Sequence, residues 1–500
     1  MAWPDFTFIL VLPTEAQLSA EERRLFSELP APGRWEEAKI FFSGLLAVRP
    51  DLSPAANALA LVAYAENDYA TALTLLLDLR HREPQNPDWL NNLGLVAAVQ
   101  GDLIAARACF ALAVKTAPNN PEIYYNQACV EIVATQPEAA LAGLRRVLAL
   151  REGHAKALFA LSRLAKENGL VGEALAACRR LLALFPESAT YRFDLGLMLL
   201  KTGAWREGLA LYEERFRVAG IPPVKQEALW QGEDCRGKTM LVEAEQGLGD
   251  SLNFVRYLSW LQGAKVCLRV PKPLLKLMQS SFADLHVIDM EAEIPACDFQ
   301  VPLLSLPFRF GTTPENLPAE VPYLFPAAAR REYWRKRLAA YSDRVRIGIV
   351  WGSNPINIKE KRRAIPPELF ARLLEVSGVF FFGLKKEQSP EDEALTAALP
   401  AEEPSRFIDL APELADLQET AAIMENLDLI ITCDTSIPHL AGALARPVWL
   451  LLPFDADWRW LLERDDSPWY PTMRLFRQPA PGAWEPVLAE VRRELRQLAG

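Results

Sequence analysis

The sequence predicts an α-helical repeat array followed by an α/β region built from parallel sheets. Two observations predict this order. A pattern of prolines and small residues recurs every 34 residues up to about residue 217. Beyond that point the period is absent, and short continuous apolar runs alternate with helix-like segments. Such runs are typical of strands buried on both faces of a parallel sheet.

Length and composition are typical of a globular, multidomain protein. Its 500 residues are enough for roughly two to four domains. Apolar residues make up 50% of the chain and charged residues 24%, which is the composition of a globular protein. The formal net charge of −10 disfavours bulk nucleic-acid binding, because proteins that bind phosphate backbones are usually basic. A local basic pocket for a phosphorylated small molecule remains compatible with this charge.

The chain shows no sign of a membrane span or a disulfide framework. No apolar stretch reaches the roughly 18–20 residues that a transmembrane helix needs. The apolar segment Phe6–Leu12 is short and has neither a basic region before it nor a cleavage site, so we do not expect a signal peptide. The 7 cysteines are scattered without a C-x-x-C pair, and the 4 histidines are far apart. We therefore expect a cytoplasmic protein without a structural metal.

The repeat period is visible at several positions at once. Prolines at one position of the repeat are separated by 34 residues or by twice that number: Pro50, Pro84, Pro118 and Pro186. Small residues twelve positions earlier keep the same spacing: Ala38, Ala72, Ala106, Ala140, Ala174 and Gly208. Each unit is expected to be two amphipathic helices that pack closely at the small residues. The pattern resembles tetratricopeptide repeats, with one degraded unit followed by five clear ones, 53–86, 87–120, 121–154, 155–188 and 189–217.

The function of the array has two interpretations. It can be a spacer or an oligomerisation surface, or it can form a concave groove for a polypeptide partner. Polar and aromatic residues on the first helices are candidates for holding a peptide backbone: Asn91, Asn92, Tyr125 and Asn126. The alternative is that they are solvated polar positions.

The second part of the chain divides into two α/β halves. Residues 1–217 form the repeat array and residues 218–237, with two prolines and several glycines, form a linker. The halves are expected at 238–335 and 345–480, followed by a C-terminal helix within 481–500 that packs back across them. The expected strands are Met240–Ala244, Lys265–Val270, His286–Met290, Arg346–Trp351, Val379–Phe382, Leu427–Thr432 and Val448–Leu452.

The loop Glu245–Ser251 (EQGLGDS) follows the first of these strands. Gly247 and Gly249 permit a tight turn at the carboxyl end of the strand, where ligands bind in such sheets. Asp250 is placed at the mouth of this loop, together with Gln246. The alternative is that Asp250 only caps the following helix, expected at Ser251–Leu261.

The segment Cys433–His439 (CDTSIPH) follows the strand Leu427–Thr432 and opens a helix expected at His439–Ala445. Asp434 can cap this helix, and Thr435 and Ser436 can hold a phosphate at its positive end. His439 follows one turn later. The alternative is plain helix capping beside a packed histidine.

Two further loops follow expected strands. The basic run Lys359–Arg363 (KEKRR) can neutralise a diphosphate, or can simply be a solvated charged surface. In the loop Gly383–Glu387 (GLKKE), Glu387 can accept hydrogen bonds from ribose hydroxyls, or can be another surface carboxylate.

Together these loops carry a resemblance to the ADP-heptose:lipopolysaccharide heptosyltransferase family of glycosyltransferases. The similar stretches are 245–258 (EQGLGDSLNFVRYL), part of 407–423, 427–453 (LDLIITCDTSIPHLAGALARPVWLLLP) and 457–478 (DWRWLLERDDSPWYPTMRLFRQ). The most specific of them is D-T-S-x-x-H-L-A-G-A-L-x-x-P. The resemblance implies a GT-B fold, which consists of two doubly wound halves, and more specifically a tetratricopeptide-fused relative of this family.

The resemblance also implies roles for the matching residues. Asp250 matches the carboxylate that acts as general base on the acceptor hydroxyl, in the loop that contains Gln246, Gly247 and Gly249. The residues that match the donor site are Ser353, Asn354, Arg363, Glu387, Asp434, Thr435, Ser436 and His439. Arg363 stands where the family usually has Lys, and Ser436 where it usually has Gly, so the resemblance does not name the sugar.

The expected reaction is therefore an inverting, metal-independent sugar transfer from a nucleotide sugar, with no cofactor. Such a reaction needs a base on the attacking oxygen and positive charge on the departing diphosphate. The sequence Asp455-Ala456-Asp457 fits a D-x-D metal motif, but it lies outside the fold that uses that motif, and we interpret it as structural.

Three functional hypotheses remain open from the sequence. The first is a glycosyltransferase whose repeats recruit a protein acceptor, which is also the layout of O-linked N-acetylglucosamine transferases. The second is a non-catalytic scaffold with a degenerate GT-B domain. The third is a transferase with a glycolipid or lipopolysaccharide acceptor. The presence of Asp250, Asp434 and His439 together favours an enzyme.

Overall fold

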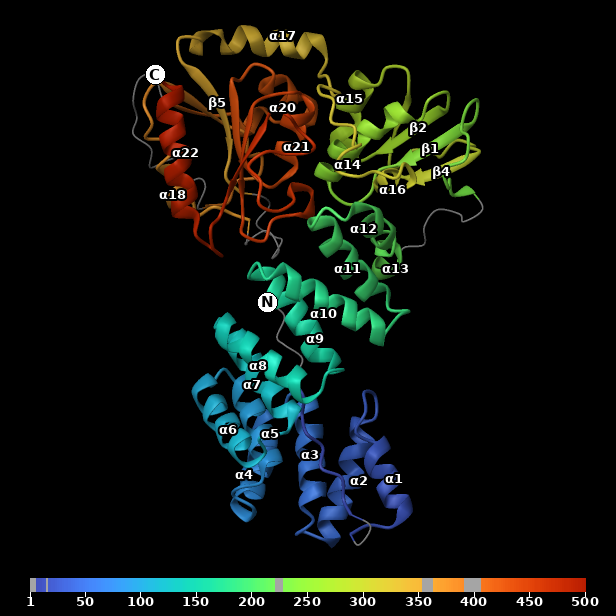
Figure 1. Ribbon diagram of the computed structural model, residues 1–500, viewed down its shortest axis with the longest axis vertical. Coiled ribbons are helices and arrows are strands. Elements are labelled where there is room, and N and C mark those ends of the chain that lie inside the picture. The colour runs from blue at the N-terminus through green and yellow to red at the C-terminus, as the bar shows by residue number, and fades with distance from the viewer. Residues whose placement is uncertain (1–5, 15–16, 221–227, 353–362, 391–405) are drawn as a thin grey trace. The chain divides into compact units, whose positions relative to one another are not determined.

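The computed structural model describes residues 6–14, 17–220, 228–352, 363–390 and 406–500 (Figure 1). The chain divides into two compact units. The first consists of residues 1–166 and 170–186, and the second of residues 167–169 and 187–500. None of the helices within the described ranges is long and apolar enough to cross a bilayer.

The first unit is built from consecutive helix pairs. Its helices are α1 (Ala20–Glu28), α2 (Trp35–Val48), α3 (Ser53–Ala65), α4 (Tyr69–Arg82), α5 (Pro87–Val99), α6 (Leu103–Thr116), α7 (Pro121–Val133), α8 (Pro137–Leu150), α9 (Ala155–Glu167) and α10 (Val171–Leu184). Proline stands in the first turn of α3, α5 and α7, where the missing N–H breaks no helical hydrogen bond. The side chains of Asn86 and Asn120 cap α5 and α7 by accepting from backbone N–H groups.

The small residues of the repeat allow the two helices of each pair to approach closely. Ala72 and Ala106 are fully buried in α4 and α6. A Cβ atom added to Gly94 would lie only 3.0 Å from the ring of Phe110, so α5 packs against α6 through the glycine. The helix pairs predicted from the 34-residue period are therefore present.

The last helix pair belongs to the second unit. It comprises α11 (Ala189–Lys201) and α12 (Trp205–Tyr212), and the short helix α13 (Arg215–Ala219) follows it. Trp205 and Tyr212 join the same hydrophobic core as Trp458 and Trp469 of the α/β region. The sequence placed this pair with the repeats up to residue 217, and in the structure its apolar face packs on the α/β region.

The first sheet contains four parallel strands in the order β3-β2-β1-β4. They are β1 (Thr239–Glu243), β2 (Lys265–Val270), β3 (His286–Asp289) and β4 (Phe299–Pro302). The accompanying helices are α14 (Leu248–Phe254), the 3₁₀ helix η2 (Val255–Trp260), α15 (Lys272–Ser281), the 3₁₀ helix η3 (Leu303–Ser305) and α16 (Leu306–Arg309). The end of the predicted linker packs on this sheet, because the backbone N–H of the buried Trp230 donates to the Gln300 carbonyl at 2.9 Å.

The second sheet contains six parallel strands in the order β10-β9-β8-β5-β6-β7. They are β5 (Val345–Val350), β6 (Val379–Gly383), β7 (Phe407–Asp409), β8 (Leu429–Cys433), β9 (Val448–Leu452) and β10 (Met473–Arg477). The accompanying helices are α17 (Ala328–Arg337), the 3₁₀ helix η4 (Leu338–Tyr341), α18 (Pro367–Ala371), the 3₁₀ helix η6 (Ala411–Glu413), α20 (Leu417–Met424), α21 (Ser436–Ala443), the 3₁₀ helix η7 (Trp458–Trp460) and α22 (Trp484–Leu498).

Helices cover both faces of the second sheet (Figure 1). Ile347, Ile349 and Phe381 pack into one core with α18 and α22, whereas Phe380 and Phe382 pack into another with α20 and α21. This is the doubly wound arrangement expected of a GT-B half. The C-terminal helix α22 buries its apolar face in the core of this sheet, so the expectation that it packs back across the two halves is wrong.

Both sheets have a point where the order of the strands reverses. In the first sheet β2 lies on one side of β1 and β4 on the other. In the second sheet the chain adds β6 and β7 on one side of β5, and then β8, β9 and β10 on the other. In open α/β sheets, ligands bind at the carboxyl ends of the strands at such points. The candidate loops 245–251 and 433–439 follow β1 and β8. Each of these strands borders the point of reversal in its sheet.

Candidate active site

The loop after β1 places Asp250 at the start of helix α14. Gln246 adopts a positive φ of 61°, and Gly247 is the N-cap residue of the helix. Asp250 Oδ2 accepts a hydrogen bond from the Gly247 N–H at 2.8 Å. Asp250 therefore stands at the third position of the helix and accepts from its N-cap residue instead of being the N-cap itself, and the helix begins earlier than the sequence predicted.

The other carboxylate oxygen of Asp250 contacts an arginine from the second half. Arg459, in the 3₁₀ helix η7, donates from Nη2 to Asp250 Oδ1 at 2.5 Å and from Nη1 to Asp457 Oδ1 at 3.0 Å. Burial alone would lower the pKa of Arg459, but the carboxylates of Asp457 and Asp250 raise it above its ordinary value. The guanidinium also packs over the rings of Phe254 and Trp458, at 5.0 and 4.8 Å from their centroids. It therefore fixes the orientation of Asp250 through charge and packing.

The loop after β8 brings a second carboxylate to the site. Thr435 is the N-cap of α21, and its hydroxyl oxygen accepts from the Ile437 N–H at 3.2 Å. Asp434 is 4% exposed, and one of its oxygens has no hydrogen-bond partner among the described residues. Burial raises the pKa of Asp434 to about 6, although the Arg363 guanidinium lowers it. The helix starts at Ser436, so Thr435, and not Asp434, is its cap.

His439 lies one turn into α21 and is held by a tyrosine from the same half. Its Nδ1 lies 3.0 Å from the hydroxyl of Tyr470, and that hydroxyl accepts from Asn253 Nδ2 at 2.7 Å. His439 Nδ1 is the nearest acceptor for the hydrogen of this hydroxyl, at 3.0 Å against 3.5 Å for the Tyr323 hydroxyl, so we assign the hydrogen to that contact, which leaves the proton of the neutral ring on Nε2. Burial holds the pKa of His439 well below its ordinary value of 6.5, and the Arg459 cation lowers it further. The ring is therefore a neutral donor at Nε2.

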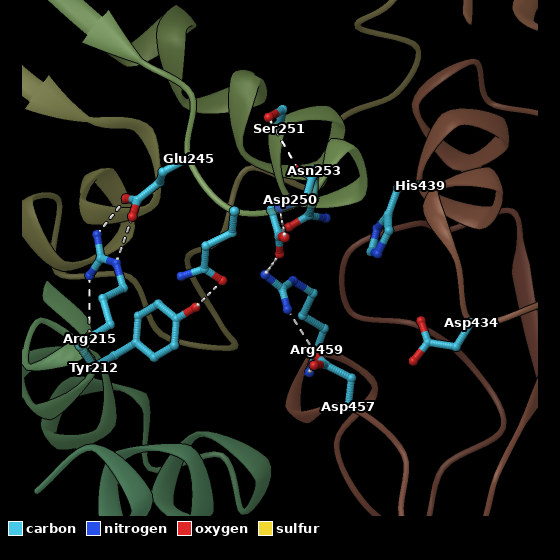
Figure 2. A network of polar contacts seen from close by, with 12 residues as sticks. Tyr212, Arg215, Glu245, Asp250, Ser251, Asn253, Asp434, His439, Asp457 and Arg459 are labelled. Carbon is cyan, nitrogen blue, oxygen red and sulfur yellow. Dashed lines mark hydrogen bonds and ion pairs between the residues drawn. The ribbon is translucent and has the colours of Figure 1, made fainter. Parts of the chain in front are cut away.

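Close packing of α14 against α21 brings the two loops together. A Cβ atom on Gly249 would lie 3.0 Å from His439 Cδ2 and 3.2 Å from the Cα of Ser436. A side chain at this position would have to displace the His439 ring and the backbone at Ser436, so glycine permits the close approach. Figure 2 shows Asp250 extending from the first half, and Arg459, Asp434 and His439 extending toward it from the second half.

The residues predicted to bind the sugar donor do not all lie together. Arg363 Nη1 lies 3.8 Å from Asp434 Oδ2, so this arginine and the loop after β8 are neighbours. Glu387 is exposed in the loop after β6, and no contact with Arg363 or Asp434 is observed. Ser353 and Asn354 lie outside the described residues.

Lys385, in the same loop, is a residue of this region that no motif had indicated. It is 8% exposed, and its Nζ lies over the Trp351 ring, 5.7 Å from the centroid. A Cβ atom on Gly352 would lie 3.4 Å from Nζ. This cation is therefore at the carboxyl end of β5, next to the point where the strand order reverses.

The helices before the α/β region contact the loop that carries Asp250. The Tyr212 hydroxyl donates to Gln246 Oε1 at 3.1 Å. The buried Arg215 makes a two-pronged ion pair with Glu245, with N–O distances of 3.0 and 2.6 Å, and donates to the Ser305 hydroxyl at 2.8 Å. The last repeat thus supports the loop after β1 directly (Figure 2).

The two aspartates of the D-x-D sequence are both engaged by cations. Asp455 forms an ion pair with Lys201 of α11. Asp457 pairs with Arg459 and also accepts from its backbone N–H at 3.0 Å. These contacts agree with a structural role for the sequence.

Besides Lys385, reasoning from single motifs missed Arg459, Tyr470 and Asn253. All three lie within stretches that carry the resemblance, Asn253 in 245–258 and the other two in 457–478. Arg459 stands between Trp458 and Trp460, and an arginine between aromatic residues is a signal for a packed guanidinium.

The asparagines of the repeats are buried and are not solvated polar positions. Asn91 and Asn92 in α5 and Asn126 in α7 are fully buried, and Tyr125 is 3% exposed with its ring 5.2 Å from that of His154. The asparagine side chains bind the backbone of residues 7–9 of the same chain.

Comparisons with known proteins agree with both parts of the structure. Residues 57–121, 125–189 and 159–217 match the tetratricopeptide repeat model, and residues 343–451 match the model of glycosyltransferase family 9 (heptosyltransferase). The chain joins tetratricopeptide repeats to a glycosyltransferase family 9 domain. The family 9 match includes β5, β6 and β8 and the Asp434–His439 segment, so the resemblance proposed from the sequence is confirmed.

Individual relatives extend over different parts of the chain. Protein FlbA of Caulobacter vibrioides is 26% identical over 521 residues, which cover 98% of this chain and 80% of FlbA. A thermophilic TPR protein from Thermus thermophilus is 24% identical, with a TM-score of 0.33, over 36% of this chain and 98% of its own. MamA from Desulfovibrio magneticus is 22% identical, with a TM-score of 0.30, over 34% of this chain and 95% of its own.

Proposed function

We propose that the protein transfers a sugar from a nucleotide sugar to an acceptor hydroxyl, with Asp250 as the general base. The observation that carries the proposal is the meeting of two loops at the points where the strand order reverses in each sheet. Asp250 comes from one loop, Asp434 and His439 come from the other, and Gly249 allows them to approach. A family 9 match over the second half supports sugar transfer as the reaction.

The Asp250 carboxylate can still accept a proton while it is held. A carboxylate has about four lone-pair positions. The Gly247 N–H and Arg459 each use one of them. The remaining positions can accept the proton of an acceptor hydroxyl as its oxygen attacks the sugar. Because the base then removes the proton from the attacking oxygen on the face opposite the leaving group, we propose transfer with inversion at the anomeric carbon.

The donor diphosphate would bind at the carboxyl ends of β5 and β8. Arg363 and Lys385 supply positive charge there, and the N-terminus of α21 adds the positive end of its dipole. His439 Nε2–H is a further neutral donor for a phosphate or sugar oxygen. We propose that these groups stabilise the departing nucleotide diphosphate without a metal. Glu387, Ser353 and Asn354 remain candidates for the nucleoside and phosphate sides.

We propose that the acceptor hydroxyl belongs to a protein that the repeats recruit. Tetratricopeptide arrays bind polypeptides on stacked helix pairs. In this chain the last repeat also touches the Asp250 loop through Tyr212 and Arg215. These contacts give the repeats a physical connection with the acceptor side of the proposed site.

The first experiment is a thermal-shift panel of nucleotide diphosphates and nucleotide sugars on the full chain. Binding raises the unfolding temperature by linkage. We expect a shift with one nucleotide class, undiminished by EDTA and lost in Arg363→Ala. Transfer from the donor so identified is then followed by mass spectrometry, and the anomeric configuration of the product by NMR. A full chain that binds no nucleotide sugar would contradict the proposal.

A further inference from the structure

The first helices of three successive repeats present asparagines in two columns. One column contains Asn57 and Asn91, and the next contains Asn92 and Asn126, each pair separated by one 34-residue period. All four side chains are fully buried. What covers them is the segment Phe6–Leu12 of the same chain, called here the N-terminal segment.

The asparagines bind this segment through its backbone. The amide of Asn126 accepts from the Thr7 N–H at 2.7 Å and donates to the Thr7 carbonyl at 2.6 Å. The amide of Asn92 likewise accepts from the Ile9 N–H and donates to the Ile9 carbonyl, both at 2.9 Å. The N–H and C=O groups of Thr7 and Ile9, which are two residues apart, thus point to the same side, as they do in an extended strand. Each asparagine occupies the position of a residue in a neighbouring strand.

The asparagine amides hold one another in the orientation that this requires. Asn92 Nδ2 donates to Asn57 Oδ1, and Asn126 Nδ2 donates to Asn91 Oδ1, both at 2.9 Å. Asn57 and Asn91 also donate to the carbonyls of Ile9 and Thr7, at 2.9 and 3.5 Å. The result is a connected network that runs from repeat to repeat and is completed by a polypeptide backbone.

The side chains of the segment contribute less than its backbone. Of its seven residues Phe6 is buried, Leu12 is 58% exposed and the five between them are half-buried, with Leu10 packed against the core of the first helices. The Phe8 ring lies 5.8 Å from that of Tyr64, and the Thr7 hydroxyl accepts from Lys156 at 3.3 Å. The main recognition is therefore by groups that every non-proline residue possesses.

We propose that the asparagine network is a binding site for any extended polypeptide, and that the N-terminal segment is a built-in competitor that a partner must displace. The partner is a peptide segment in extended conformation, without proline at the two positions whose N–H groups are bound. The inference rests on the proposed recruitment of a protein by the repeats. Its test measures binding alone, so it can stand or fail independently of sugar transfer.

The effect of a tethered competitor on the apparent affinity for an added peptide can be predicted. A tether holds its segment at an effective concentration on the order of millimolar. The apparent affinity for an added peptide is reduced by the fraction of molecules in which the site is open. Removal of the segment should therefore tighten the binding of an added peptide about tenfold or more.

The experiment uses a fluorescein-labelled peptide with the sequence of residues 6–13, flanked by lysines for solubility. Its binding is followed by fluorescence anisotropy with the full chain, with a chain that lacks residues 1–14, and with the full-length variant Ile9→Pro. Proline removes the N–H that Asn92 accepts, so the variant releases the segment without deleting it. We expect tighter binding to both altered proteins than to the full chain.

Two further peptides test whether the backbone is what is recognised. A peptide of the same composition in scrambled order should bind within about threefold, because the asparagines read no side chain. A peptide N-methylated at the positions of Thr7 and Ile9 should lose binding about tenfold or more, because it lacks both donors. In the chain lacking residues 1–14, Asn92→Ala should weaken binding, whereas the exposed Asn119→Ala in the loop before α7 should not.

Several outcomes would overturn the inference. Equal binding to the full and shortened chains would show that the segment does not compete. An absence of binding to a shortened chain that retains its helical circular dichroism and cooperative melting would show that the network is not a peptide site. If both the shortened chain and Ile9→Pro fail to fold, the segment is a permanent part of the repeat unit and not a displaceable occupant.

Discussion

Arg459 Nη2 lies 2.5 Å from Asp250 Oδ1, although 209 residues separate the two in the sequence. The contact joins the loop after β1 of the first sheet to the segment after β9 of the second. Arg459 also holds Asp457, so one buried cation serves two carboxylates. The proposed base is thus positioned by the opposite half of the enzyme, and any movement between the halves would change its surroundings.

Replacement of Asp250 by Asn should abolish turnover without loss of donor binding. The amide keeps the size of the carboxylate and can still accept from the Gly247 N–H, but it cannot take a proton. Loss of a general base lowers kcat by about 10²–10⁴-fold. The measurements are kcat with saturating donor and donor affinity by isothermal titration calorimetry, for the purified Asp250→Asn protein.

Asp416→Asn provides a matched control for that substitution. Asp416 caps a helix, by accepting from the Glu419 N–H at 3.1 Å, and it pairs with Lys276 at 2.9 Å. It has no contact with the proposed site. We expect its kcat to stay within about twofold of the unaltered enzyme. An Asp250→Asn protein with normal turnover would assign the base elsewhere.

Replacement of Arg459 by Met should destabilise the protein strongly. It leaves Asp250 and Asp457 without their shared cation, and breaking a buried ion pair on one side costs about 3–5 kcal/mol. Urea unfolding followed by tryptophan fluorescence measures the free energy of unfolding. Arg335→Met, which removes an exposed pair with Glu332 on α17, should leave the midpoint unchanged. Equal midpoints for the two variants would show that Arg459 does not stabilise the assembled halves.

The repeat period and the strong apolar runs were sufficient to predict most of the fold. β2 (Lys265–Val270) and β9 (Val448–Leu452) have the bounds expected from the sequence. The strands that were missed are β4, β7 and β10. They are short or lie at a sheet edge, and their polar residues interrupt the apolar run. A pattern that detects strands buried on both faces does not detect these.

The parts of the site that depend on tertiary contacts were not predictable from single motifs. Asp250, Asp434 and His439 were found because each follows or opens a recognisable element. The contacts that hold them come from Arg459 and Tyr470, which are distant in sequence and carry no motif of their own. Likewise, the asparagines of the repeats were recognised as peptide-binding candidates, but their occupant in the same chain was not.

Replacement of Asp434 by Asn should stabilise the protein at pH 8. Burial raises the pKa of this carboxyl from 3.8 to about 6, so between pH 4 and pH 6 the folded state binds more protons than the unfolded state. Stability therefore falls as the pH rises through this range, by about 2–3 kcal/mol in all. The variant lacks this decline, and the gain in its free energy of unfolding should be largest at pH 8 and smallest near pH 4.

Asp428→Asn should change the free energy of unfolding at pH 8 in the opposite direction, by lowering it, and serves as the comparison. Arg346 holds the pKa of Asp428 below its ordinary value despite partial burial, so the ionised form stabilises the folded state above pH 4. Urea midpoints from pH 4 to pH 8 measure both variants. His439 is present in all the proteins, so its contribution to the pH dependence of stability cancels when each variant is compared with the unaltered protein. A destabilised Asp434→Asn at pH 8 would show that the carboxylate is better paired than its contacts indicate.

The contacts of the last helix pair predict where the enzyme can be shortened. A fragment of residues 187–500 should fold, because it keeps α11, α12 and α13 on the α/β region. A fragment of residues 218–500 loses Trp205, which stacks on Trp469 with ring centroids 5.1 Å apart, and loses Arg215, the partner of Glu245. Loss of one buried tryptophan side chain alone typically costs about 3–5 kcal/mol. We therefore expect the shorter fragment to melt about 10 °C lower or to aggregate. Differential scanning calorimetry and limited proteolysis compare the two, and equal melting temperatures would place the functional boundary at 217 after all.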